Sequence, residues 1–174
     1  MGDFLHLLIR YFNAINMSKI PIIFCFLVIH TLAHNGPTYV KGRGYEGYVF
    51  EASHPLWFTG NDPERRFTPS RDEIRYAEGL LKKQIRVLNA RHENQIGHCP
   101  IIDKNLRKYK RQYVGLLNAK NEKIIWVNCI WGKKAGSDIS KEIIQVFDGC
   151  SYFWGVKINL NTGVVYDLTI NGLG

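Results

Sequence analysis

The densest group of cationic side chains in the sequence lies between positions 104 and 113. Five Lys and Arg residues fall within the eight positions from Lys104 to Arg111, with Tyr109 among them and Tyr113 two positions further on. Exposed cations attract anionic ligands, and tyrosine rings can stack on a sugar or a base. We therefore predict a recognition surface for an anionic ligand or molecular surface, formed by Lys108, Tyr109, Lys110, Arg111 and Tyr113.

The strand expected here places these residues on two faces. Side chains alternate along a strand, so Lys108, Lys110 and Gln112 share one face, and Tyr109 and Arg111 share the other with Tyr113. An alternative interpretation is that this is the first, edge strand of a sheet. Its lysines would then prevent edge-to-edge aggregation.

A second group of residues with chemical potential is His92, His98 and Cys99. Structural zinc sites use four ligands, and no second cluster at metal-site spacing follows. The carboxylates are scattered, without a pair in acid and base positions. We assign no metal site, no cofactor and no catalytic residue.

Beyond the leader described next, the sequence contains three cysteines, Cys99, Cys129 and Cys150. Three pairings are possible, and each leaves one thiol over. Cys129 shares its strand facing with Ile125 and Val127, which predicts a buried, inert thiol. The favoured disulfide joins Cys99 and Cys150, because both lie beside loops.

Residues 17–33 have the pattern of a cleavable signal peptide. Lys19 provides a basic head, an apolar run extends from Ile20 to Ile29, and Thr31 and Ala33 occupy the cleavage positions. The run is too short to span a bilayer. We expect an exported protein, periplasmic or secreted, in which residues 1–16 are a mis-assigned upstream extension.

The sequence predicts one long helix with two overlapping caps at its start, Thr68 before Pro69 and Ser70 before Glu73. Ser70 and Glu73 form a capping box, and Ile74, Ala77, Leu81 and Ile85 recur at helical spacing. The helix should end between residues 89 and 92. The residues before it, 34–67, are expected to be a flexible segment and loop, with a short strand at 48–50.

The remaining chain alternates like a series of strands. We expect a hairpin of residues 109–118 and 123–131, then strands at 150–160 and 164–170 joined by the Asn161-Thr162-Gly163 turn. A further strand at 143–147 depends on whether Asp148-Gly149 is a turn or a bulge. The prediction is an α+β fold, with one long helix packed on an antiparallel meander of four to five strands in a single domain, residues 68–174.

One helix followed by antiparallel strands resembles the cystatin and NTF2-like architectures. The resemblance covers residues 68–174 and implies fold. The Gln112-Tyr113-Val114-Gly115 segment is similar to the inhibitory hairpin of cystatins, but Leu116 replaces the final glycine and no proline follows Pro100. We therefore expect no inhibition of papain-like proteases. The closing run, residues 148–172, also resembles small exported bacterial proteins of unassigned function.

The chain carries 23 Lys and Arg residues against 15 Asp and Glu, a net charge of +8, which favours anionic partners. No motif argues for nucleic acid. The sequence thus predicts an exported, non-catalytic binding module, and the alternatives are a cystatin-like protease inhibitor or a small enzyme on the same fold.

Overall fold

The computed structural model describes residues 36–56 and 65–173. The expected upstream extension, 1–16, and the expected signal peptide, 17–33, lie outside these ranges. Among the described residues, no helix combines the length and apolar character that crossing a bilayer requires.

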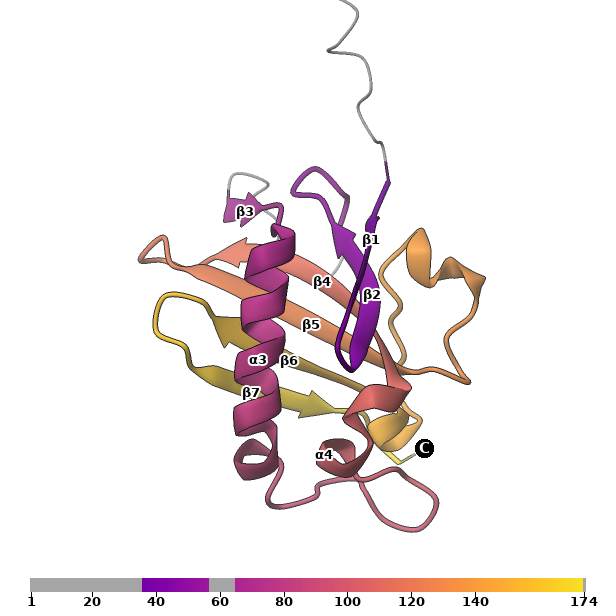
Figure 1. Cartoon of the computed structure of the whole chain (residues 1–174). Coiled ribbons are helices and arrows are strands. Elements are labelled where there is room, and N and C mark those ends of the chain that lie inside the picture. Colours follow the sequence, from indigo (N-terminus) through magenta and orange to yellow (C-terminus); the bar gives the residue numbers. More distant parts are fainter. Residues whose placement is uncertain (1–35, 57–64, 174) are drawn as a thin grey trace, which may run out of the picture. The chain divides into compact units, whose positions relative to one another are not determined.

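Seven strands form one mixed sheet (Figure 1). The order along the sheet is β1-β2-β4-β5-β6-β7, and β3 pairs with one end of β4. All neighbouring strands are antiparallel except β2 and β4, which are parallel. The strands are β1 (Thr38–Gly42), β2 (Tyr45–Phe50), β3 (Arg66–Phe67), β4 (Tyr109–Leu117), β5 (Lys123–Trp131), β6 (Phe153–Asn159) and β7 (Val165–Ile170).

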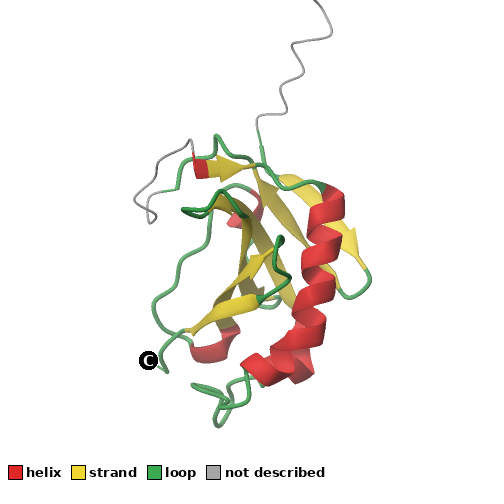
Figure 2. Cartoon of the chain, turned by 90° about the vertical axis from the view of Figure 1, so that its left-hand side faces the viewer, coloured by secondary structure: helices red, strands yellow, loops and turns green. Residues whose placement is uncertain are grey.

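The long helix, α3 (Arg71–Leu88), lies along one face of the sheet (Figure 2). Of the two expected caps it uses Ser70, whose hydroxyl accepts from the Glu73 amide, while the Glu73 carboxylate accepts from the Ser70 amide. It ends at Asn89. A short helix, α4 (Ile102–Asn105), and a 3-10 turn, η3 (Leu106–Lys108), then lead into β4.

The main core lies between α3 and the sheet. Ile74, Leu81 and Ile85 of α3 pack with strand residues such as Tyr113 and Trp154. On the opposite face, residues 132–149 run as a loop that includes the 3-10 turn η4 (Ser137–Ser140). The buried Gln112 amide holds this loop by donating to the carbonyls of Ile139 and Glu142.

The predicted fold class is wrong in the number and direction of the strands. Residues 38–47, part of the segment expected to be flexible, form the β1–β2 hairpin together with the expected short strand 48–50, and β2 pairs in parallel with β4. Parallel neighbours need a long crossover connection, and α3 lies within that crossover. The sheet is therefore mixed, because β1, β2 and β3 extend the antiparallel strands β4–β7 that follow α3.

Two further strand assignments are corrected. Residues 143–147 form no strand, and Gly149, with φ of +86°, leads into the 3-10 turn η5 (Cys150–Tyr152) that precedes β6. The edge-strand interpretation of residues 108–113 is also wrong, because β4 has β2 on one side and β5 on the other.

The disulfide prediction is confirmed. Cys99 and Cys150 are bonded, with 6.1 Å between their Cα atoms. Cys129 is a free cysteine and fully buried, as its strand facing indicated.

Candidate functional site: a basic groove

The five residues of the predicted surface do not lie together on the surface. Tyr109, Arg111 and Tyr113 face the core and are at most 1% exposed. Lys110 is half-buried and forms an ion pair with Glu46 of β2. Only Lys108 is exposed, with its ammonium group 5.5 Å from the centre of the Trp131 ring. The tyrosines are therefore part of the fold and not of a recognition surface.

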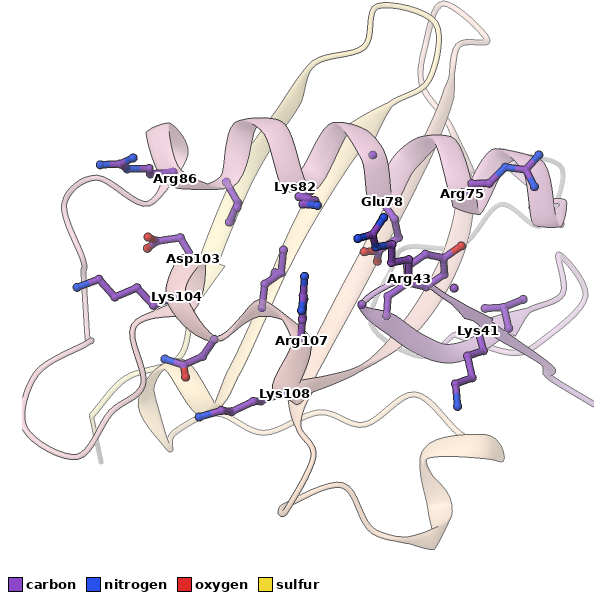
Figure 3. A pocket seen from close by; sticks show the side chains of 18 of the residues that line it. Lys41, Arg43, Arg75, Glu78, Lys82, Arg86, Asp103, Lys104, Arg107 and Lys108 are labelled. Atoms are coloured by element: carbon purple, nitrogen blue, oxygen red, sulfur yellow. The ribbon is translucent and has the colours of Figure 1, made fainter.

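Lys108 instead lines a groove of about 1000 Å³. Its walls come from three parts of the chain: α3, the tip of the β1–β2 hairpin, and the α4–η3 segment. Figure 3 shows Arg75, Lys82 and Arg86 along the helix, with Lys104, Arg107 and Lys41 on the other side. We call this cavity the basic groove. Nine of its 19 lining residues are cationic: Lys41, Arg43, Arg71, Arg75, Lys82, Arg86, Lys104, Arg107 and Lys108.

Most of these charges are not neutralised by the protein. All nine side chains are exposed, and Arg75 pairs with Asp72, 2.7 Å away, on the open helix surface. Within residues 36–56 and 65–173, the other eight cations make no ion pair. Like charges held around one cavity repel each other, so an anion that enters the groove relieves this repulsion.

The helical wall follows directly from the sequence of α3. Arg71, Arg75, Lys82 and Arg86 are four, seven and four residues apart, which keeps them on one side of the helix. The row is about 22 Å long, since each helical residue rises about 1.5 Å. Gly79 lies in the middle of the row and lines the groove.

Gly79 leaves open space at the centre of this wall. A Cβ placed there would meet nothing within 4 Å, so the fold imposes no steric need for glycine. Glycine inside a helix costs about 1 kcal/mol relative to alanine. The missing side chain widens the groove between the two pairs of helix cations.

The opposite wall joins the hairpin tip to η3. Gly44 has φ of +91°, a conformation that a residue with a side chain rarely adopts. A Cβ at Gly44 would lie 3.3 Å from Nε of Arg107, so the two segments are in close contact. Because the two segments are in contact, the cations of the hairpin and of η3 form one continuous wall of the groove.

At the floor of the groove, the lining residue Glu78 contacts the buried Arg111. Arg111 Nε lies 2.8 Å from Glu78 Oε1, and the same oxygen accepts from the Tyr113 hydroxyl at 2.8 Å. The Arg111 guanidinium also donates to the carbonyls of Tyr109 and Leu106. Burial raises the pKa of Glu78 above its ordinary value, although Arg111 and Tyr113 oppose the shift. Because Arg111 contacts both α3 and η3, this cluster fixes the two walls relative to each other.

The α4 part of the wall is held at its other end by a buried amide network. The Asn89 side chain donates to Gln95 Oε1 at 2.9 Å and to Asp103 Oδ1 at 2.8 Å. Gln95 Oε1 also accepts from the backbone amide of Ile102. The network joins the end of α3 to the start of α4, and within it the Asp103 carboxylate accepts a hydrogen bond from Asn89.

The disulfide anchors the same wall to the sheet. Cys99 directly precedes the segment that enters α4, and Cys150 lies in η5 next to β6. Nearby, the Ser151 hydroxyl donates to the Pro100 carbonyl at 2.6 Å, and the Tyr109 hydroxyl donates to the Ser151 carbonyl at 2.7 Å. The groove therefore depends on contacts far from its cations.

The cysteines do not provide a thiolate site. His98, Cys99 and Cys150 offer ligand atoms within 4.8 Å of one another, but both sulfur atoms are in the disulfide, and the metal ligand is a thiolate. Burial raises the pKa of Cys129 to about 12, so this thiol stays protonated.

The chemistry that the groove supports is the binding of anions. Its two carboxylates, Glu78 and Asp103, already accept hydrogen bonds from side chains of the fold. Arginine guanidinium groups form paired hydrogen bonds with carboxylate, sulfate or phosphate, and five of the nine cations are arginines.

Sequence reasoning missed most of this site. The spacing of Lys82 and Arg86 from Arg71 and Arg75 marks a single cationic row beside the apolar stripe, but such a row by itself indicates only a solvated helix face. No local pattern indicates that the hairpin tip faces this row, because that placement results from the parallel β2–β4 pairing.

A comparison of the chain with models of protein families, with curated proteins and with solved structures finds no match. The Gln112–Gly115 segment, similar in sequence to the cystatin hairpin loop, lies within β4, where Gln112 and Gly115 are buried.

Proposed function

We propose that this chain is an exported, non-catalytic binding protein whose ligand is anionic and binds in the basic groove. The observation that carries the proposal is the set of nine exposed cations around one cavity, of which eight have no ion-pair partner among the described residues. A soluble protein gains nothing in stability from concentrating repulsive charge at one place. The binding of an anionic ligand would account for the clustering of these cations.

The floor and walls support a preformed site. The Glu78–Arg111 contact and the Asn89–Gln95–Asp103 network hold the backbone of both walls without using any of the nine cations. A ligand therefore meets cations carried on a fixed backbone, which limits the ordering cost of binding.

Export is supported by two features. Residues 17–33 have the signal-peptide pattern, and the Cys99–Cys150 disulfide is compatible with an oxidising compartment. Intact-mass analysis of secreted protein should give an N-terminus at or near His34. Uncleaved protein in the cytoplasm would contradict this part of the proposal.

The binding proposal is tested by retention on immobilised heparin, a linear polyanion, with elution by NaCl. The double variant Lys82→Ala/Arg107→Ala removes one cation from each wall. The matched control, Lys83→Ala/Lys120→Ala, removes two exposed cations outside the groove and gives the same net charge. We expect the groove variant to elute at lower salt and the control to elute with the wild type.

Equal shifts for the two double variants would mean that retention reflects total charge alone, and the proposal would then fail. Both pairs change exposed side chains, so neither should alter the unfolding free energy by more than about 0.5 kcal/mol.

A further inference from the structure

We propose that the ligand of the basic groove is a linear acidic polysaccharide that lies along α3. The inference rests on the proposed function and adds the class of ligand. It is carried by the length of the cation row, by the open space at Gly79 and by the absence of a free aromatic ring among the described residues that line the groove.

The distribution of the cations fits a chain of anionic groups better than a single one. The helix cations, from Arg71 to Arg86, extend over about 22 Å at the rise of an α-helix. A small anion bound at one end of this row leaves the cations at the other end unpaired. A linear polyanion can pair with both ends at the same time.

The position of Gly79 fits a ligand that crosses the middle of the row. The two cation pairs, Arg71 with Arg75 and Lys82 with Arg86, lie on either side of it. Without a side chain at this point, a sugar ring can approach the helix backbone between the two pairs. The fold itself gives no reason for a glycine there.

The composition of the groove argues against single-stranded nucleic acid. Such ligands are bound by a cationic groove combined with exposed aromatic rings on which their bases stack. The aromatic residue among the groove's lining residues is Tyr45, which is half-buried, and a Cβ at Gly42 would collide with its ring. The ring is therefore packed against the hairpin backbone on one side, whereas guanidinium and ammonium groups suit the sulfate and carboxylate groups of a glycan.

The test measures the dissociation constants of the full chain for heparin-derived oligosaccharides of increasing length, from disaccharide to decasaccharide, at fixed salt. Affinity should rise about two- to fivefold for each further anionic group that finds a cation, the gain of an exposed ion pair, and should level off once the ligand spans the row. Oligogalacturonates of matched length separate carboxylate from sulfate recognition. A single-stranded oligonucleotide of matched charge serves as the competitor from another class.

Two glycine variants test the path of the ligand. Gly79→Gln adds a side chain in the groove, and because glutamine is a better helix former than glycine, the variant should fold at least as well as the wild type. Gly136→Gln is the control, since Gly136 lies in an exposed loop where an added Cβ also meets nothing within 4 Å. We expect Gly79→Gln to lower the affinity for the decasaccharide at least fivefold and Gly136→Gln to leave that affinity unchanged.

The outcomes separate the inference from the proposed function. A disaccharide that binds as tightly as the decasaccharide, while still depending on Lys82 and Arg107, would overturn the linear ligand and leave an anion-binding groove. An oligonucleotide that binds at least tenfold tighter than the matched glycans would overturn the polysaccharide class. If the Lys82→Ala/Arg107→Ala variant binds every ligand as tightly as the wild type, the proposed function is overturned as well.

Discussion

Removing the Cys99–Cys150 disulfide should weaken the whole domain and the groove together. The bond closes a loop with a sequence separation of 51 residues. In the chain-entropy model, a cross-link of this span stabilises the native state by about 4 kcal/mol at 25 °C. Since small domains are stable by only about 5–15 kcal/mol, the double variant Cys99→Ala/Cys150→Ala should retain a much smaller margin.

The assay is urea unfolding followed by tryptophan fluorescence, because the chain has four tryptophans and Trp154 is buried in the core. The wild type in reducing agent should unfold like the double variant, and reducing agent should have no effect on the variant itself. Retention on heparin should fall as well, because the disulfide anchors the segment that enters α4. An unfolding free energy within 1 kcal/mol of the oxidised wild type would refute this account of the disulfide.

Three further predictions concern single residues. Cys129 has a pKa of about 12 and is buried, so peptide mapping should find it unmodified by iodoacetamide in the native protein and alkylated after denaturation; rapid native labelling would contradict its burial. Gly79→Ala should raise the unfolding free energy by about 1 kcal/mol, and a decrease would mean that the fold does need glycine there. Burial alone would raise the pKa of Glu73, but hydrogen bonds from Lys123 and Ser70 lower it below 4.5. Glu73→Gln keeps the capping box and removes the charge, so the wild type should be more stable than the variant at pH 7. The wild type should lose this advantage progressively as the pH falls below 4.5, where Glu73 becomes protonated. Urea titrations across this pH range measure the difference, and a difference independent of pH would contradict the prediction.

Local signals predicted the parts of the fold that depend on neighbouring residues. The capping box at Ser70 and the apolar stripe of α3 are local features, and the structure contains both. The β4–β5 hairpin and the Cys99–Cys150 pairing were also predicted correctly.

The errors came from contacts between distant parts of the chain. The parallel pairing of β2 with β4 brings residues 47–50 beside residues 111–114, and nothing in either segment alone specifies it. Tyr113 and Arg111 of the predicted surface are buried because they lie on the face of β4 that α3 covers. The alternation of those side chains was anticipated, but the alternation alone does not indicate which face α3 covers.

The same long-range pairing explains why the groove was not anticipated. It places the β1–β2 hairpin tip near η3, opposite a cationic row whose helical spacing is visible in the sequence. A row of cations on one helix is ordinarily a solvated face, and it becomes a site only when a second basic wall lies across from it.

The most direct test of the groove is a comparison of two neighbouring charge reversals on α3. Lys82 lines the groove and Lys83, the next residue, does not, although both are exposed. Lys82→Glu should raise the dissociation constant for a heparin octasaccharide at least tenfold, because the lost attraction and the new repulsion together amount to about 1.4 kcal/mol or more. Lys83→Glu should change this dissociation constant by no more than about twofold, because solvent and distance screen the charge at position 83 from the ligand. Equal weakening by the two variants would contradict the central claim that the groove, and not the total charge of the protein, binds the anionic ligand.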